Sequence, residues 1–354
     1  MHAVPPASDL NNPAGAEFRL DRVFGHTRAP WNVRVTARLR RLPLLRALGW
    51  WNVGCDWLAC SGLLRFRGKF TYRRGSESRE IPFDGRNGQF EAIHDPLYRN
   101  GYEPETSLLL ARLNHGPSVF YDIGANWGYF SLLVAAAPGF TGKIHAFEPN
   151  TVSRADLIAT IAAAGLGDMV TPHALALTDF TGESHLRAGA SFRTGLAGLS
   201  TAGDGTRITV KRLDDLELPP PTCLKIDVEG AEAAVLRGAA RVLRTARPFV
   251  VIENFLNRDA HEGTLEPLLL LEAAGYRLFV PALALRWQGT DLLTSYWTHI
   301  PTLLAEQQAA PIHLMPLHAR ERFLFSHHLN LLACPEERVA ALTSHPKIKL
   351  ARNS

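Results

Sequence analysis

Cysteine is scarce in this 354-residue sequence, and the few present form no paired motif. Cys55, Cys60, Cys223 and Cys334 include no CxxC pair and no metal-type spacing with histidine. A disulfide framework and a zinc site are therefore not expected, and the pattern is typical of a protein from a reducing compartment.

Long hydrophobic runs are also lacking. No stretch of about 20 residues is free of both charge and proline, so no membrane span is predicted. The first residues, MHAVPPASDLNNPAG, do not show the charged-then-apolar pattern of a signal peptide. Because 46% of the residues are hydrophobic and 20% are charged, as in soluble globular proteins, we expect a cytoplasmic protein.

Positive charge is concentrated near the N-terminus. Residues 1–80 hold 13 Arg and one Lys against six acidic residues, a net charge of +8, whereas the whole chain carries +4. Within this region residues 33–64 are amphipathic and rich in tryptophan, which would suit peripheral contact with the inner face of a membrane. Packing on the main domain or in a homo-oligomer is the preferred interpretation, because charge alone rarely specifies a partner.

The sequence pattern changes near residue 118, where short apolar segments begin to alternate with segments of helical periodicity. This alternation predicts an α/β fold, with a mostly parallel sheet covered by helices on both faces. We expect an N-terminal accessory region over 1–100, with an irregular start, a basic amphipathic helix and a hairpin. The main domain is expected over 101–290, and an irregular C-terminal cap or tail over 291–354.

A glycine turn follows the first apolar segment of the main domain, in VFYDIGANWGYFS (119–131). Gly124 would permit a tight turn, and Gly128 would let the next helix approach closely. Asn126 stands where a dinucleotide-binding fingerprint has its second glycine, so the backbone is less suited to the close approach of a pyrophosphate. Asp122 would repel a pyrophosphate but could bind an ammonium group, directly or through water.

A second carboxylate ends the next apolar segment, in IHAFEPN. Glu148 is well placed there to accept hydrogen bonds from both hydroxyls of a ribose, and Pro149 and Asn150 would follow at the edge of an adenine. An amine-binding acid, a glycine turn and a ribose-binding acid together fit S-adenosylmethionine, which has an amino-acid end, a ribose and no phosphate.

Five segments in succession resemble the motifs of the FkbM-type S-adenosylmethionine-dependent methyltransferases: DIGANWGYFS, AFEPN, RLDDL, LKIDVEGAEAAVLRGA and RPFVVIEN. The resemblance covers roughly residues 100–285, and HLNLLACP (328–335) is similar to the family's closing segment. It implies the class I methyltransferase fold, a Rossmann-like sheet of seven strands whose last strand is antiparallel. It also implies O-methylation of a sugar, a glycan or a natural product.

Three carboxylates are candidates for the chemistry. Asp227 ends an apolar segment and is expected near the transferred methyl group and the cofactor; Glu229 follows it, and Glu253 ends the next segment. Asp227 or Glu253 is the expected base, since a sugar hydroxyl loses its proton as it attacks. The alternative is that Asp227, Glu229 and Glu253 hold Mg²⁺, which would acidify the hydroxyl. Glu232 is expected to cap a helix.

Other functions stay open on the sequence alone. They are a nucleic-acid or protein methyltransferase, a NAD-dependent oxidoreductase and a non-catalytic cofactor-binding protein. The expected partner is a small-molecule or glycan hydroxyl acceptor, and no nucleic acid is expected because LKIDVEG lacks the Asn-Pro-Pro-aromatic motif of many base methyltransferases.

Overall fold

The computed structural model describes most of the chain from residue 18 onward. The described residues are 18–31, 34–35, 66–85, 87–95, 98, 101–188, 197–200, 205–257, 261–283, 311–325 and 329–351. The amphipathic segment expected over residues 33–64 therefore lies outside them, except for Arg34 and Val35. None of the helices in the described ranges is long and apolar enough to cross a membrane.

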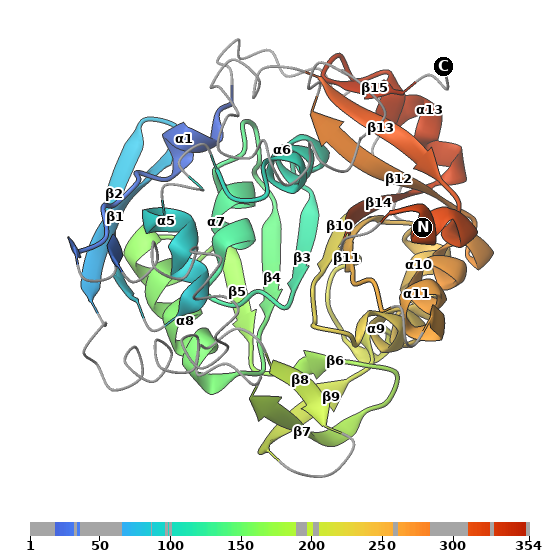
Figure 1. The fold of residues 1–354 in the computed structure, drawn as a ribbon, viewed down its shortest axis with the longest axis horizontal. Coiled ribbons are helices and arrows are strands. Elements are labelled where there is room, and N and C mark those ends of the chain that lie inside the picture. The colour runs from blue at the N-terminus through green and yellow to red at the C-terminus, as the bar shows by residue number, and fades with distance from the viewer. Residues whose placement is uncertain are drawn as a thin grey trace.

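A nine-stranded sheet forms the centre of the described structure, in the order β15-β13-β12-β14-β11-β10-β3-β4-β5 (Figure 1). Its strands are β3 (Val119–Ile123), β4 (Lys143–Phe147), β5 (Val170–His173), β10 (Cys223–Ile226), β11 (Phe249–Asn254), β12 (Tyr276–Leu283), β13 (Ile312–Leu317), β14 (Leu329–Pro335) and β15 (Ile348–Leu350). Strands β5, β4, β3, β10 and β11 are parallel, and β14 runs antiparallel between β11 and β12.

The predicted fold class is confirmed, but the strand count of seven is wrong. Seven strands, from β5 to β12, make the expected sheet with its antiparallel last strand, and β13 and β15 extend it beyond β12. The expectation of an irregular tail after residue 290 is likewise wrong for its described part, because β13, β14 and β15 all belong to the main sheet.

Helices cover both faces of the sheet because side chains alternate along each strand. Phe120 packs in a core with α6 (Pro104–Leu113), α7 (Tyr129–Ala135) and α8 (Thr151–Ala164). Its neighbour Tyr121 packs in a second core with α9 (Glu232–Gly238) and α11 (His261–Ala273). The helical segment after Asp227 is divided at Ala239 into α9 and α10 (Ala240–Thr245). The remaining described helices are α1 (Leu20–Val23), α5 (Glu91–His94), α13 (Val339–Thr343) and the 3-10 turns η2 (Gly88–Phe90), η4 (Leu213–Asp215), η7 (Ala319–Leu324) and η8 (Glu336–Arg338).

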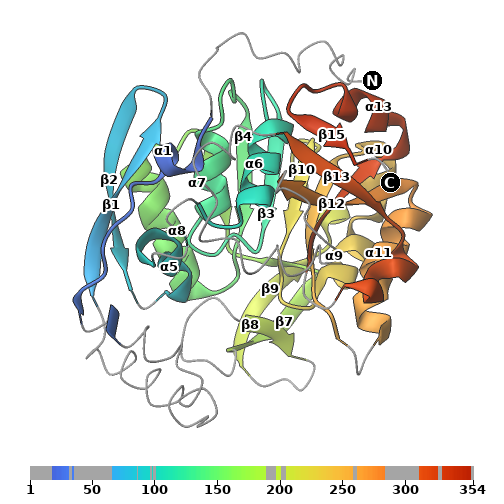
Figure 2. The same cartoon turned by 45° about the horizontal axis from the view of Figure 1, so that its top comes forward.

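The predicted N-terminal hairpin is present and packs beside α7 and α8 (Figure 2). Strands β1 (Arg67–Arg74) and β2 (Glu77–Asp84) pair antiparallel, and the hydroxyl of Tyr72 donates to the carbonyl of Leu132 in α7 at 2.9 Å. Trp127 of the glycine turn is fully buried, with its ring 4.5 Å from Phe90 and 5.8 Å from Phe70. The hairpin therefore supports the turn from outside the main sheet.

A separate four-stranded sheet, which the sequence did not predict, stands at one end of the main sheet (Figure 1). It consists of β6 (Ala176–Leu177), β9 (Thr206–Lys211), β7 (Gly182–Ala188) and β8 (Ala197–Ser200). It supplies one wall of the cavity that contains most of the predicted site residues.

Candidate active site

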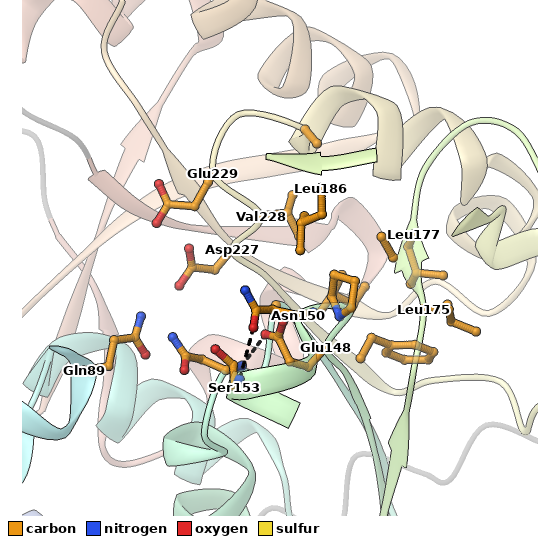
Figure 3. Close-up of a pocket in the computed structure, with 17 residues that line it drawn as sticks. Gln89, Glu148, Asn150, Ser153, Leu175, Leu177, Leu186, Asp227, Val228 and Glu229 are labelled. Carbon is orange, nitrogen blue, oxygen red and sulfur yellow. Dashed lines mark hydrogen bonds between the residues drawn. The ribbon is translucent and has the colours of Figure 1, made fainter. Parts of the chain in front are cut away.

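A cavity of about 700 Å³, including its open mouth, lies beyond the carboxyl ends of β3, β4 and β10 (Figure 3). This is the edge at which open parallel sheets bind ligands. Its lining residues are Gln89, Ile123, Gly124, Asn126, Phe147, Glu148, Pro149, Asn150, Ser153, Leu175, Ala176, Leu177, Leu186, Asp227, Val228, Glu229 and Ala231.

The glycine turn forms the floor of this cavity. Gly124 has a φ of +84°, and a Cβ placed on it would lie 1.8 Å from the main-chain oxygen of Asp227, so only glycine fits. Asn126 has a φ of +49°, a left-handed conformation that asparagine tolerates, and its Oδ1 accepts a hydrogen bond from Nδ2 of Asn87 at 2.9 Å. Gly128 does not line the cavity; its φ is +95°, and a Cβ there would lie 2.7 Å from Leu157 of α8.

Glu148 stands at the middle of the cavity wall, only 7% exposed. One carboxylate oxygen accepts from the backbone N–H of Asn126 at 2.9 Å, and the other from that of Asn150 at 2.7 Å. Burial raises the pKa of Glu148 to about 7, although both amides and Arg154 oppose that shift. A carboxylate oxygen has more than one acceptor position, so each can still accept from a ligand hydroxyl.

Apolar side chains surround one end of the cavity beyond Glu148. Leu175 and Leu177 lie there in Figure 3, and Phe147, Leu186 and Val228 complete the apolar part of the lining. Pro149 and Asn150 line the cavity beside Glu148, and the side chain of Asn150 also caps α8 by accepting from the amides of residues 152 and 153. A flat apolar ring with a diol beside it would match this arrangement.

Asp122 lies behind the cavity rather than in its lining. Its side chain is fully buried, and Oδ2 accepts from the hydroxyl of Ser131 in α7 at 2.7 Å. Oδ1 has no hydrogen-bond partner within the part of the chain that the structure describes. Burial raises the pKa of Asp122, and the neighbouring Lys225 opposes that shift.

Asp227 and Glu229 lie at the polar end of the cavity with Gln89 (Figure 3). The ammonium of Lys225 lies 2.8 Å from Oδ2 of Asp227 and 4.4 Å from the ring centre of Phe130. Burial, followed by the charges of Asp227 and Glu232, raises the pKa of Glu229 to about 7.

Two further carboxyl groups lie next to Asp227, outside the cavity lining. Glu253 is hydrogen-bonded to Asp227, and its pKa is well above the usual range because of burial and of that neighbour. Glu103 accepts from Nδ2 of Asn330 in β14 at 3.0 Å, and burial raises its pKa to about 7. Sequence reasoning missed Gln89, Glu103 and Asn330, because only the fold brings these distant segments together.

Glu232 is the first residue of α9, and its carboxylate binds the preceding loop instead of forming the predicted helix cap, since the N-cap residue Ala231 has no side-chain cap hydrogen bond. One oxygen of the Glu232 carboxylate accepts from the backbone N–H groups of Val228, at 3.3 Å, and Gly230, at 3.1 Å. For Mg²⁺, the described residues contain no group of three or more histidine, cysteine, aspartate or glutamate side chains arranged to hold a metal ion. The charge of Asp227 is instead matched by Lys225.

A family comparison identifies the part of the chain that builds this cavity. The sequence model of the methyltransferase FkbM domain matches residues 122–278, from the glycine turn to β12. Residues 122–278 are a methyltransferase FkbM domain. The family resemblance is thereby confirmed for this segment, and Gln89 and Glu103 lie outside it.

The chain is also similar to three named proteins. The hexuronic acid methyltransferase AglP of Haloferax volcanii is 26% identical over 165 residues, which are 46% of this chain and 66% of AglP, just under two thirds of its length. A methyltransferase FkbM structure from Methylobacillus flagellatus is 19% identical, covers 54% of this chain and 48% of its own, and has a TM-score of 0.37. An O-methyltransferase structure from Bacillus cereus in complex with SAH (S-adenosylhomocysteine) is 10% identical. The match covers 65% of this chain and 78% of that one, with a TM-score of 0.35.

Proposed function

We propose that this protein is an S-adenosylmethionine-dependent O-methyltransferase that acts on a hydroxyl of a sugar, a glycan or a natural product. The observation that carries the proposal is one cavity with two unlike ends. Glu148 and the apolar wall occupy one end, and Asp227, Glu229 and Gln89 occupy the other. A nucleoside suits the first end and a hydroxyl acceptor the second.

The residues of the first end fit the cofactor by their chemistry. Glu148 would accept hydrogen bonds from the two ribose hydroxyls, beside Pro149 and Asn150 at the adenine edge. Asp122 is fully buried behind the lining, so it would meet the cofactor's ammonium through a water rather than directly. When bound, S-adenosylmethionine supplies an activated methyl group on a sulfonium.

The second end would remove the proton. S-adenosylmethionine, if held at the first end, would supply the methyl carbon and its sulfur would keep the electron pair of the broken bond, while Asp227 would accept the proton of the attacking hydroxyl. In-line alignment can contribute about 7–11 kcal/mol and a positioned base about 10²–10⁴-fold. Asp227 lines the cavity and contacts Lys225, whereas Glu253 does not line it, which favours Asp227 of the two candidate bases.

The acceptor class rests on the name of the relative. AglP is a hexuronic acid methyltransferase, a name that gives a sugar acid as the acceptor, and for this chain we propose a hydroxyl of a sugar because Asp227 could take its proton. A NAD-dependent oxidoreductase is disfavoured because a pyrophosphate crossing this cavity would meet the carboxylates of Asp227 and Glu229.

Calorimetry with S-adenosylmethionine, S-adenosylhomocysteine and NAD tests the cofactor half. We expect micromolar binding of the first two, abolished by Ala176→Trp, which fills the cavity, and retained by Ala159→Trp on the exposed side of α8. Binding of NAD alone would overturn the proposal. Radiolabelled methyl transfer to neutral hexoses and hexuronic acids, with the product position determined by NMR, then tests the acceptor, and methylation at nitrogen or carbon would refute the O-directed part.

A further inference from the structure

Lys225 is a buried cation at the polar end of the cavity. Its side chain is 3% exposed, and it stands in β10 directly beside Asp122 of β3 in the parallel register. Burial alone lowers the pKa of Lys225, but the charges of Asp227, Asp122 and Glu103 together raise it above the ordinary value. Lys225 is therefore an ammonium at neutral pH, and it needs a carboxylate in contact.

The carboxylate in contact is Asp227, at 2.8 Å. Glu253 is hydrogen-bonded to the same Asp227, so two carboxyl groups adjoin one another. Two partly buried carboxyl groups in hydrogen-bond contact share one proton, because both cannot be ionised at that distance. The ammonium stabilises the charge on the carboxyl that it touches, so the proton belongs on Glu253.

Glu103 adds a third carboxyl group from outside the matched domain. It lies immediately before α6 with a φ of +41°, a conformation that costs a non-glycine residue free energy. Nδ2 of Asn330 and the hydroxyl of Tyr102 hold its side chain near Lys225. Strained backbone with a fixed side chain is typical of a functional position.

The charged and titratable groups around Asp227 come from five parts of the fold. They are Lys225 of β10, Asp122 of β3, Glu253 of β11, Glu229 and Glu232 at the start of α9, and Tyr102 and Glu103 before α6. Lys225 is the one cation among these described groups. Its removal would leave Asp227 among acidic side chains and the Tyr102 phenol, with no cation among these described groups.

We infer that Lys225 is a positioning residue that holds Asp227 ionised, while Glu253 keeps the proton that the two carboxyl groups share. The inference deepens the proposed function, because only that function makes Asp227 the base for the acceptor hydroxyl. The charge distribution itself does not depend on methyl transfer.

Carbon-13 NMR of the full chain, labelled at the aspartate and glutamate carboxyl carbons, tests this charge distribution without an acceptor. Asp227→Asn and Glu253→Gln assign the two resonances by their disappearance. At neutral pH we expect the Asp227 resonance at the position of an ionised carboxylate and the Glu253 resonance at that of a protonated acid. The reverse assignment, or two ionised groups, would overturn the inference on the wild-type protein alone.

Variants of Lys225 test whether this lysine holds Asp227 ionised. Lys225→Met should raise the titration midpoint of Asp227 by about one to three pH units, since an opposite charge in contact is lost. Lys225→Arg should restore the wild-type midpoint, and Lys69→Met, which removes an exposed partner of Glu80, should not change it. An unchanged midpoint in folded Lys225→Met would refute the role of Lys225. Failure of methyl transfer with the NMR result intact would instead count against the proposed function.

Discussion

A Cβ on Gly124 would lie 1.8 Å from the main-chain oxygen of Asp227, so the glycine turn after β3 and the strand end after β10 are in direct backbone contact. The turn that borders the proposed cofactor end of the cavity therefore also fixes Asp227, which stands at the proposed reacting end. One backbone contact ties the two halves of the proposed site together.

Gly124→Ala should accordingly disrupt both halves. We expect the free energy of unfolding to fall by about 2–5 kcal/mol, from the positive φ and from the clash with a carbonyl that cannot move freely. Gly139→Ala is the matched control, because Gly139 has a φ of +75° and no atom within 4 Å of its Cβ position. It should lose only about 1–2 kcal/mol. Urea denaturation measures both, and equal losses would show that the contact with Asp227 is unimportant.

Cofactor binding should strengthen as the pH rises through 7, because Glu148 must be ionised to accept from two hydroxyls. Its pKa is raised by burial to about 7, so S-adenosylhomocysteine should bind about tenfold more weakly at pH 6 than at pH 8. Glu148→Gln should remove the part of this dependence that belongs to Glu148, and calorimetry of both proteins across the range provides the measurement.

The raised pKa of Glu148 also affects the free energy of unfolding, which should fall as the pH rises, whereas cofactor binding should strengthen. The folded carboxyl has a higher pKa than the unfolded one, which is about 4.3, so the folded state binds more protons between the two values. Glu148 therefore contributes stability at low pH that is lost as the pH rises through about 7. A Glu148→Gln variant with the same slope of stability against pH as wild type would contradict the shifted pKa.

The alternating core was predictable because its signals are local. The apolar segments of β3, β4, β10 and β11 and the helices between them can each be recognised within about ten residues of sequence. At Asn126 the sequence predicts only that the second glycine of a dinucleotide fingerprint is missing. The structure adds that the backbone there has a left-handed φ of +49°, which asparagine tolerates.

The additional strands and the charge cluster were not predictable in this way. β13 and β15 pair with strands far away in the sequence, and Pro316 within β13 obscures its strand pattern. Lys225 was visible as one polar residue in an apolar segment, but its partners Asp122 and Glu103 come from other strands and helices. The two-residue spacing of Lys225 and Asp227 in LKIDVEG is that of side chains on one face of a strand, but no spacing within the segment indicates that Asp122, Glu253 and Glu103 gather around them.

Arg322 should be among the most important residues for stability in the C-terminal region. It is fully buried in η7, and its guanidinium donates to Oδ1 of Asn254 at 2.5 Å, to the Asn254 carbonyl at 2.9 Å and to the Phe325 carbonyl at 3.3 Å. Burial lowers its pKa to about 10, so it stays charged at neutral pH. These bonds hold the end of β11, one residue after Glu253, against the C-terminal segment.

Arg322→Met should therefore reduce the free energy of unfolding by about 2–4 kcal/mol, since it leaves buried acceptors of Asn254 without donors. Arg320→Met, on the exposed side of the same turn, should change it by no more than about 0.5 kcal/mol. Because Asn254 adjoins Glu253, we also expect a change in the Glu253 carboxyl resonance of Arg322→Met under conditions where the protein remains folded. A folded Arg322→Met variant with wild-type stability and an unshifted Glu253 resonance would mean that η7 does not support the reacting end of the cavity.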